Sequence, residues 1–190
     1  SKKVAVIPTL SLFHSFLFSD AGPQLDDPVL QRSVPAFLLE KMRRQDFMEA
    51  ERELFRKVAR IPVYEWVEQT LPVFRENVKK MHQAGVRLAV GSDGGGPVGY
   101  NFQGFNTPWE LELLVESGLT PLEAIVAATR NGAEVIGIAD RVGTIEKGKW
   151  ADLLILRKDP LKDIRNIRSI ERVVLNGRVY DRREFSYRSR

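Results

Sequence analysis

A continuous apolar run that ends in an acidic, glycine-rich loop constrains the fold of this chain most. Residues 86–96 read VRLAVGSDGGG, in which an apolar segment lies between Gly85 and Gly91. A short apolar run bounded by glycines is typical of a strand buried on both faces of a parallel sheet. Asp93 follows at the carboxyl end of that strand, where ligands and catalytic groups gather in parallel α/β folds. Asp93 is therefore a candidate metal ligand or proton acceptor, although Asp and Gly are also ordinary turn residues.

A second buried strand is predicted at residues 4–10, VAVIPTL, and it leads into an aromatic loop at residues 11–20 that contains His14. Residues 28–85, between the two strands, carry helical rather than strand patterns. Their clearest segment, residues 71–82, predicts an amphipathic helix that stops at Gly85. We expect the following residues on its apolar side: Val73, Phe74, Val78 and Met81.

Two further helices are predicted to begin with the same device. The sequences TPWE at 107–110 and TPLE at 120–123 each place Thr at the N-cap, Pro at the first helical position and Glu three residues on. The Thr and Glu side chains can then satisfy free backbone N–H groups reciprocally. From residue 137 onward the pattern changes to alternation, and Asn176-Gly177 is a strong signal for a two-residue hairpin. A small β domain is therefore expected after an α/β one.

Composition limits the chemistry. The chain has no Cys, which excludes disulfides and thiolate metal sites, and its two histidines are His14 and His82. No apolar stretch reaches the ~18 residues of a membrane span, and no signal peptide is recognisable, so a cytoplasmic location is expected. Residues 157–190 carry 11 Lys and Arg against 5 Asp and Glu. Because these charges alternate with apolar residues and no nucleic-acid motif accompanies them, we expect a sheet with one wet face rather than nucleic-acid binding.

Taken in succession, these segments resemble the amidohydrolase superfamily, especially imidazolonepropionases and Xaa-Pro dipeptidases. The resemblance rests on the strings VAVIPTL, AGVRLAVGSDGG, SGLTPLEAIVAATRNGAEVIGI, DRVGTIEKGKWADLLIL and VVLNGRVY. It implies an α/β fold that is part of a metal-dependent-hydrolase (β/α)8 barrel, about strands 7 and 8 with their helices, plus a small C-terminal β domain. The implied boundaries are residues 1–136 for the C-terminal part of the barrel and 137–190 for the β domain, as part of a composite β-sandwich.

The same resemblance implies a hydrolase of amide or related C–N and ester bonds that uses one or two divalent metals, commonly zinc, to activate water. Asp93 matches the family's Asp after the eighth strand, which contacts the metal and moves the water's proton. The other family ligands belong to segments absent from this sequence. We therefore expect the chain alone to be inactive and to need the N-terminal half of the barrel, from the same or a separate chain. A small-molecule or peptide-like substrate is implied, and a homo-oligomer is an open possibility.

Several other residues are compatible with more than one role. His14 could contact substrate or simply pack, whereas His82 is expected at the surface of its helix. Gly94, Gly95 and Tyr100 are further candidates for substrate contact. The glycines at 94–99 could instead bind phosphate, and Ser92 lacks a following His that could act as its base. A rival interpretation is a non-catalytic structural or interaction module that keeps the family's C-terminal half.

Overall fold

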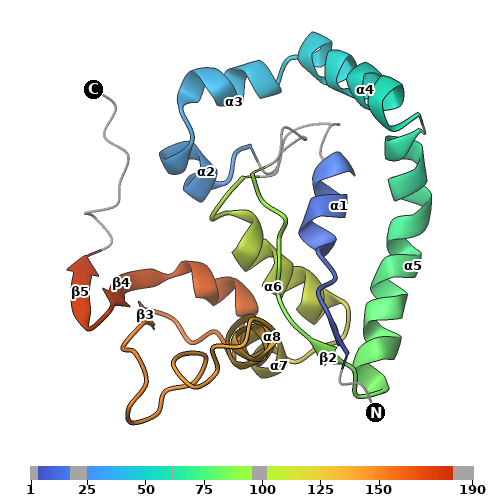
Figure 1. The fold of residues 1–190 in the computed structure, drawn as a ribbon. Helices are drawn as coiled ribbons and strands as arrows, with labels where there is room; N and C mark the ends of the chain where they lie inside the picture. The colour runs from blue at the N-terminus through green and yellow to red at the C-terminus, as the bar shows by residue number, and fades with distance from the viewer. Residues whose placement is uncertain (1–3, 18–24, 61, 96–101, 182–190) are drawn as a thin grey trace.

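The computed structural model describes residues 4–17, 25–60, 62–95 and 102–181. Strands β1 (Ala5–Val6) and β2 (Arg87–Leu88) pair in parallel, with Val6 opposite Leu88. Helix α1 (Leu10–Leu17) follows β1 and packs between α5 and α6 (Figure 1). Parallel strands joined through helices confirm the expected α/β class.

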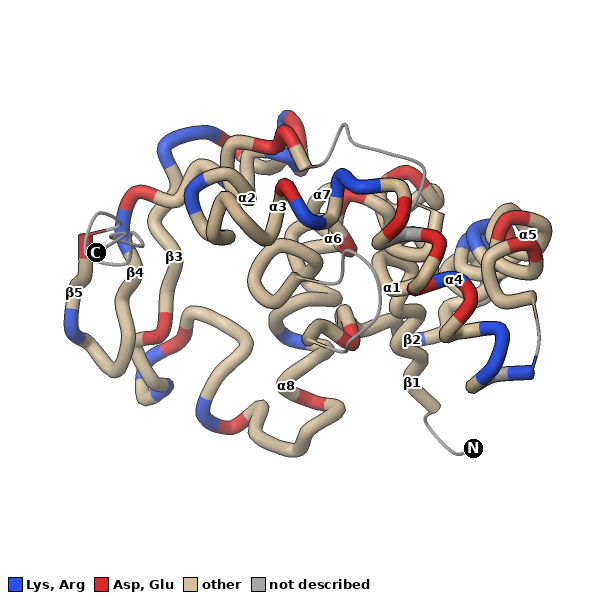
Figure 2. Tube along the Cα trace, turned by 90° about the horizontal axis from the view of Figure 1, so that it is seen from above, with Lys and Arg blue, Asp and Glu red and all other residues tan. Residues whose placement is uncertain are grey.

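The stretch between the strands is helical, as predicted. Asp27 caps the first of these helices by accepting a hydrogen bond of 2.6 Å from the N–H of Val29, and Pro28 takes the first helical position. Charged residues of both signs lie close together along the following helices (Figure 2). The elements are α2 (Pro28–Ser33), α3 (Ala36–Met42), α4 (Gln45–Ala59) and α5 (Val63–Gln83).

Helix α5 is longer than the predicted segment and begins more than two turns before it, at Val63. Its buried positions Val63, Val67 and Leu71 recur every four residues, and Val78 continues the same stripe. The helix runs through Pro72 without ending. The predicted place of Val73 on the apolar side is wrong, because Val73 lies two residues beyond Leu71 on a helix and is 55% exposed.

The second half of the chain begins with the helices that cover β2. The capping box at Thr120 is confirmed: its hydroxyl accepts from the N–H of Glu123, and the Glu123 carboxylate accepts from the N–H of Thr120. These helices supply much of the main core, including Leu113 and Leu114. The elements are α6 (Asn106–Glu116), α7 (Pro121–Val126), the π-helical turn η2 (Ala127–Asn131) and α8 (Gly132–Val135).

A three-stranded antiparallel sheet closes the described chain, in the order β3 (Leu153–Leu156), β4 (Ile170–Leu175) and β5 (Arg178–Asp181). The predicted hairpin at Asn176-Gly177 is confirmed, with φ of 50° and 77° at the two turn residues, as a type I′ turn requires. The short 3-10 helix η3 (Ile164–Arg168) leads into β4 and packs against α6.

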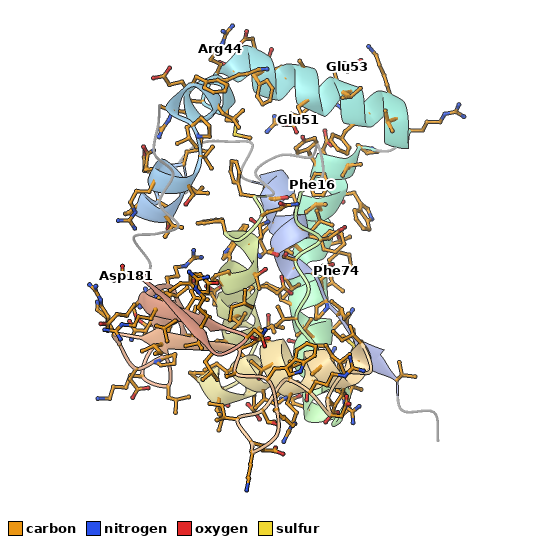
Figure 3. All side chains as sticks on the ribbon, turned by 60° about the vertical axis from the view of Figure 1, so that its left-hand side comes forward. Phe16, Arg44, Glu51, Glu53, Phe74 and Asp181 are labelled. Atoms are coloured by element: carbon orange, nitrogen blue, oxygen red, sulfur yellow. The ribbon has the colours of Figure 1, made fainter. Side chains whose placement is uncertain are left out.

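Two expectations for the N-terminal segment are wrong. Residues 4–10 do not form a strand buried on both faces, because Val4 and Ile7 are 66% and 46% exposed. Within the described ranges β1 pairs with a single strand, so neighbours that would bury these side chains are lacking. The aromatic stretch is a helix rather than a loop from Leu10 to Leu17, and Phe16 turns toward the helices around it (Figure 3).

Among the helices that the structure describes, none combines the length and the apolar character needed to cross a membrane.

Candidate functional site

Asp93 follows β2 as the sequence predicts, but the strand is shorter than expected and ends at Leu88, five residues before Asp93. Leu88 of β2 and the next residue, Ala89, are 3% and 1% exposed, whereas Asp93 is exposed. Its backbone has φ of 46°, the left-handed conformation that Asp tolerates better than most residues. Asp93 is thus an exposed residue in the segment that follows β2.

The carboxyl ends of β1 and β2 approach each other closely. A Cβ atom at Gly91 would lie 2.5 Å from Cγ2 of Ile7, which is closer than real side chains come. A glycine is therefore required between β2 and Asp93 for the two strand ends to meet. One residue on, the Ser92 hydroxyl lies 3.4 Å from the hydroxyl of Thr107 in the first turn of α6.

The first turn of α6 also fixes the start of α1. The predicted capping box at 107–110 is wrong, since α6 begins at Asn106 with no side-chain cap. Glu110 instead accepts hydrogen bonds from the backbone N–H groups of Leu10 and Ser11, at 3.0 and 2.6 Å. The first N–H groups of a helix have no acceptor within the helix, and Glu110 supplies one for α1. An acidic group near a helix N-terminus also stabilises the helix.

Glu110 itself is fully buried. Burial raises the pKa of its carboxyl above the ordinary value, and the N–H donors of Ser11 and Leu10 oppose part of that rise. Sequence reasoning missed this residue, because its spacing to Thr107 fits a capping box as well as that of Glu123 to Thr120. The competing N–H donors come from residues about 100 positions away, so no local signal could have found them.

His14 sits on α1 with its ring against Trp109 of α6, at 5.5 Å between ring centroids. Burial, followed by the positive charge of Arg75, lowers the pKa of His14 to about 4. The imidazole is therefore neutral at neutral pH. The aromatic contact supports the packing interpretation of His14, and its role toward substrate stays a prediction.

The lowered pKa of His14 makes the folded chain more stable as pH rises from about 4 to 6.5. In that window the unfolded chain binds a proton that the folded chain does not, so raising the pH favours folding. His14→Phe keeps an aromatic ring against Trp109 and should flatten the slope of the denaturation midpoint against pH. Gln83→Ala, at an exposed position of α5 with no titrating group, keeps His14 and should preserve the slope. An unchanged slope in His14→Phe would show that His14 does not titrate this way.

The remaining predicted residues fall in different places. Gly94 and Gly95 form the turn after Asp93, and a side chain at Gly95 would meet Gln103. Tyr100 and the later glycines of the predicted phosphate loop lie outside the described residues. His82 is on α5, as expected, with its Nε2 atom 3.4 Å from the Glu123 carboxylate.

A metal centre needs more ligands than this neighbourhood offers. Asp93 is a suitable oxygen ligand, but a catalytic zinc is usually held by three protein side chains. Across the described ranges, no group of three or more His, Asp or Glu side chains is placed to hold a metal ion. The described residues therefore do not form a complete metal site. Asp93 is a single candidate ligand, and further ligands would have to come from elsewhere.

Comparisons with known proteins agree with the α/β fold described above. The model of the amidohydrolase family matches residues 48–180. The chain is 35% identical over 104 residues to an imidazolonepropionase of Thermoplasma volcanium, which is 52% of this chain and 25% of that protein. It is 41% identical over 87 residues to the ochratoxinase of Aspergillus niger, which is 44% of this chain and 16% of that protein.

Solved structures resemble this chain in fold as well. A Xaa-Pro dipeptidase with bound methionine superimposes with a TM-score of 0.55 at 26% identity, over 70% of this chain and 33% of its own. The A. niger ochratoxinase shares the fold, with a TM-score of 0.60 at 22% identity over 94% of this chain and 32% of its own. The chain thus spans a third or less of these proteins. The family match covers most of the sequence, and the chain belongs to the amidohydrolase family.

Proposed function

We propose that this chain is part of a metal-dependent hydrolase of amide or related C–N and ester bonds, with Asp93 as a metal ligand and proton acceptor. One observation carries the proposal. An exposed aspartate follows the carboxyl end of a parallel strand, beside the end of its neighbour, in a chain of the amidohydrolase family. That edge of a parallel α/β fold is where catalytic groups collect.

A divalent ion, expected to be zinc as one or two ions, would lower the pKa of a bound water and polarise the scissile carbonyl. The part assigned to this chain is proton transfer. Asp93 would accept the proton of the attacking water and deliver it to the leaving nitrogen or oxygen. His14, Gly94, Gly95 and Tyr100 are proposed to contact the substrate, a small molecule or peptide-like compound.

The other metal ligands are proposed to come from polypeptide outside the described residues, the N-terminal half of the barrel. In this proposal residues 1–136 form the C-terminal part of a TIM-like barrel and residues 137–190 a small β domain. The length of the relatives supports it, since this chain spans 16–33% of them.

An open apolar cavity supports the same idea. A space of about 840 Å³ lies between the helices after β2 and the antiparallel sheet, and it is lined by Ile125, Ala133 and Leu154 among others. Apolar side chains on its rim remain exposed, Ile136 by 68% and Trp150 by 53%. Contiguous apolar surface of this kind marks an interaction site. We propose that the polypeptide completing the barrel and the β domain covers it.

The natural protein, isolated from its source cells, tests the proposal. Its mass should exceed the 21.6 kDa of this chain, or a second polypeptide should copurify. It should cleave members of a panel of acylated amino acids and dipeptides, lose that activity with a chelator and regain it with Zn²⁺. This chain alone should be inactive. Activity that survives complete metal removal would overturn the proposal, and a metal-free, inactive natural protein would favour the non-catalytic module.

The cytoplasmic location and the absence of nucleic-acid binding stay predictions.

A further inference from the structure

The segment that leads from β2 to Asp93 is held from both edges. On one edge the N–H of Ala89 donates to the carbonyl of Val6, at 3.0 Å, within the pairing of β1 and β2. Backbone groups of successive residues in a strand point to opposite edges. The groups of Leu88 and Val90 therefore point away from β1, toward the helices that follow.

The π-helical turn η2 meets that outer edge with two hydrogen bonds. The side-chain amide of Asn131 donates to the carbonyl of Leu88 at 2.8 Å, and the N–H of Val90 donates to the carbonyl of Ala127 at 3.2 Å. Ala127 is 1% exposed, so its backbone lies directly against the strand. A π-helical turn is rare and often marks a functional site. Here the first and last residues of the turn, Ala127 and Asn131, bond the same strand.

A second contact supports the turn. Gly143 has φ of 95°, and a Cβ atom there would lie 2.7 Å from Cβ of Ala133 and 3.1 Å from the carbonyl oxygen of Thr129. The loop at Gly143 therefore packs against the turn at a distance that only glycine allows. Strand, π turn and loop form a contiguous packed unit behind the Asp93 segment.

We propose that Asn131 is a positioning residue for Asp93. With Ala127 it fixes the outer edge of β2 at Leu88 and Val90, three to five residues before the carboxylate, and so sets where that carboxylate stands. The catalytic consequence rests on the proposed function of Asp93. Outer groups that orient a ligand typically change metal affinity or activity 10- to 100-fold when they are removed.

Amide hydrogen exchange on this chain tests the placement without metal or substrate. Asn131→Asp keeps the size of the side chain but turns an acceptor toward the Leu88 carbonyl, and Asn131→Ala removes the group. Thr129→Ala is the matched control, because the Thr129 hydroxyl donates its hydrogen bond to the carbonyl of Ile125, within the same helical run, rather than to β2. Amides of the β4–β5 hairpin serve as the internal reference for folding.

In both Asn131 variants, the amide hydrogens of residues 88–95 should exchange about tenfold faster or more, as the loss of a buried hydrogen bond predicts. The exchange rates of the hairpin amides should stay unchanged. Thr129→Ala should leave residues 88–95 as they are. Equal protection of residues 88–95 in all variants would overturn the inference, as would equal acceleration by Thr129→Ala.

A second readout separates this inference from the proposed function. In the natural protein, Zn²⁺ affinity should fall 10- to 100-fold in Asn131→Asp and at least as far in Asp93→Asn. If Asp93→Asn binds Zn²⁺ normally, the proposed role of Asp93 fails, and the exchange data alone decide what Asn131 does. If Asp93→Asn loses Zn²⁺ but Asn131→Asp keeps full affinity, the positioning role is overturned.

Discussion

Asp93→Asn should lower the hydrolytic rate of the natural protein about 10²- to 10⁴-fold, the range for loss of a positioned acid or base. The amide cannot accept the proton of the attacking water and is a poorer metal ligand than a carboxylate. Asn tolerates the left-handed backbone of position 93 as well as Asp does, so the fold should remain. Steady-state kinetics on a substrate found in the panel, with circular dichroism as a check of folding, measure the effect.

Asp140→Asn is the matched control for this substitution. Asp140 is an exposed aspartate in a loop, with its carboxylate 3.5 Å from Arg141. Surface substitutions of this kind change stability by less than about 0.5 kcal/mol, and the rate should stay at the wild-type value. A rate for Asp93→Asn within about threefold of wild type would remove Asp93 from the proposed mechanism, because a proton acceptor supplies at least about 10²-fold.

Glu110→Ala should be the most destabilising single substitution at the site, with a loss of about 2–5 kcal/mol in the free energy of unfolding. It leaves the N–H groups of Leu10 and Ser11 buried without their acceptor and opens a cavity between α1 and α6. Chemical denaturation of this chain measures the loss. Glu53→Ala is the control, since Glu53 projects from α4 into solvent (Figure 3) and pairs only weakly with Lys57 at 3.4 Å.

The pH dependence of stability reports the burial of the Glu110 carboxyl. A raised pKa means that the folded chain holds a proton at a pH where the unfolded chain has released it. Glu110 therefore makes the chain less stable as pH rises from the ordinary carboxyl pKa to its raised value. Glu110→Gln does not titrate and should lack this decline. If Glu110→Ala costs no more than Glu53→Ala, the carboxylate does not hold α1 in place.

The sequence predicted those elements that local chemistry decides. Thr120 and Glu123 form their capping box, and Asn176-Gly177 forms its hairpin, because each signal is satisfied within a few residues. The identical pattern at Thr107 and Glu110 failed, since Glu110 is buried against N–H donors of a distant helix. Tertiary contacts therefore override a local signal where a polar group is buried.

The candidate site likewise has one part that local sequence predicts and another that depends on tertiary contacts. Asp93 was predicted at the end of a buried strand from a run of apolar residues, and it follows the shorter strand β2. The contact of His14 with Trp109 and the bond from Asn131 to Leu88 join residues 43 or more positions apart. No periodicity within either segment records such a partner. The sequence thus predicts that a carboxylate follows the strand. The contacts that position this carboxylate are seen only in the structure.

The metal content of the natural protein tests the central claim most directly. Elemental analysis of the protein from its source cells, beside its Asp93→Asn variant, gives the number of zinc ions per polypeptide. We predict one or two zinc ions in the natural protein and a clear loss in Asp93→Asn. A natural protein that hydrolyses its substrate with no bound metal, or an Asp93→Asn variant that keeps the full complement, would contradict the account.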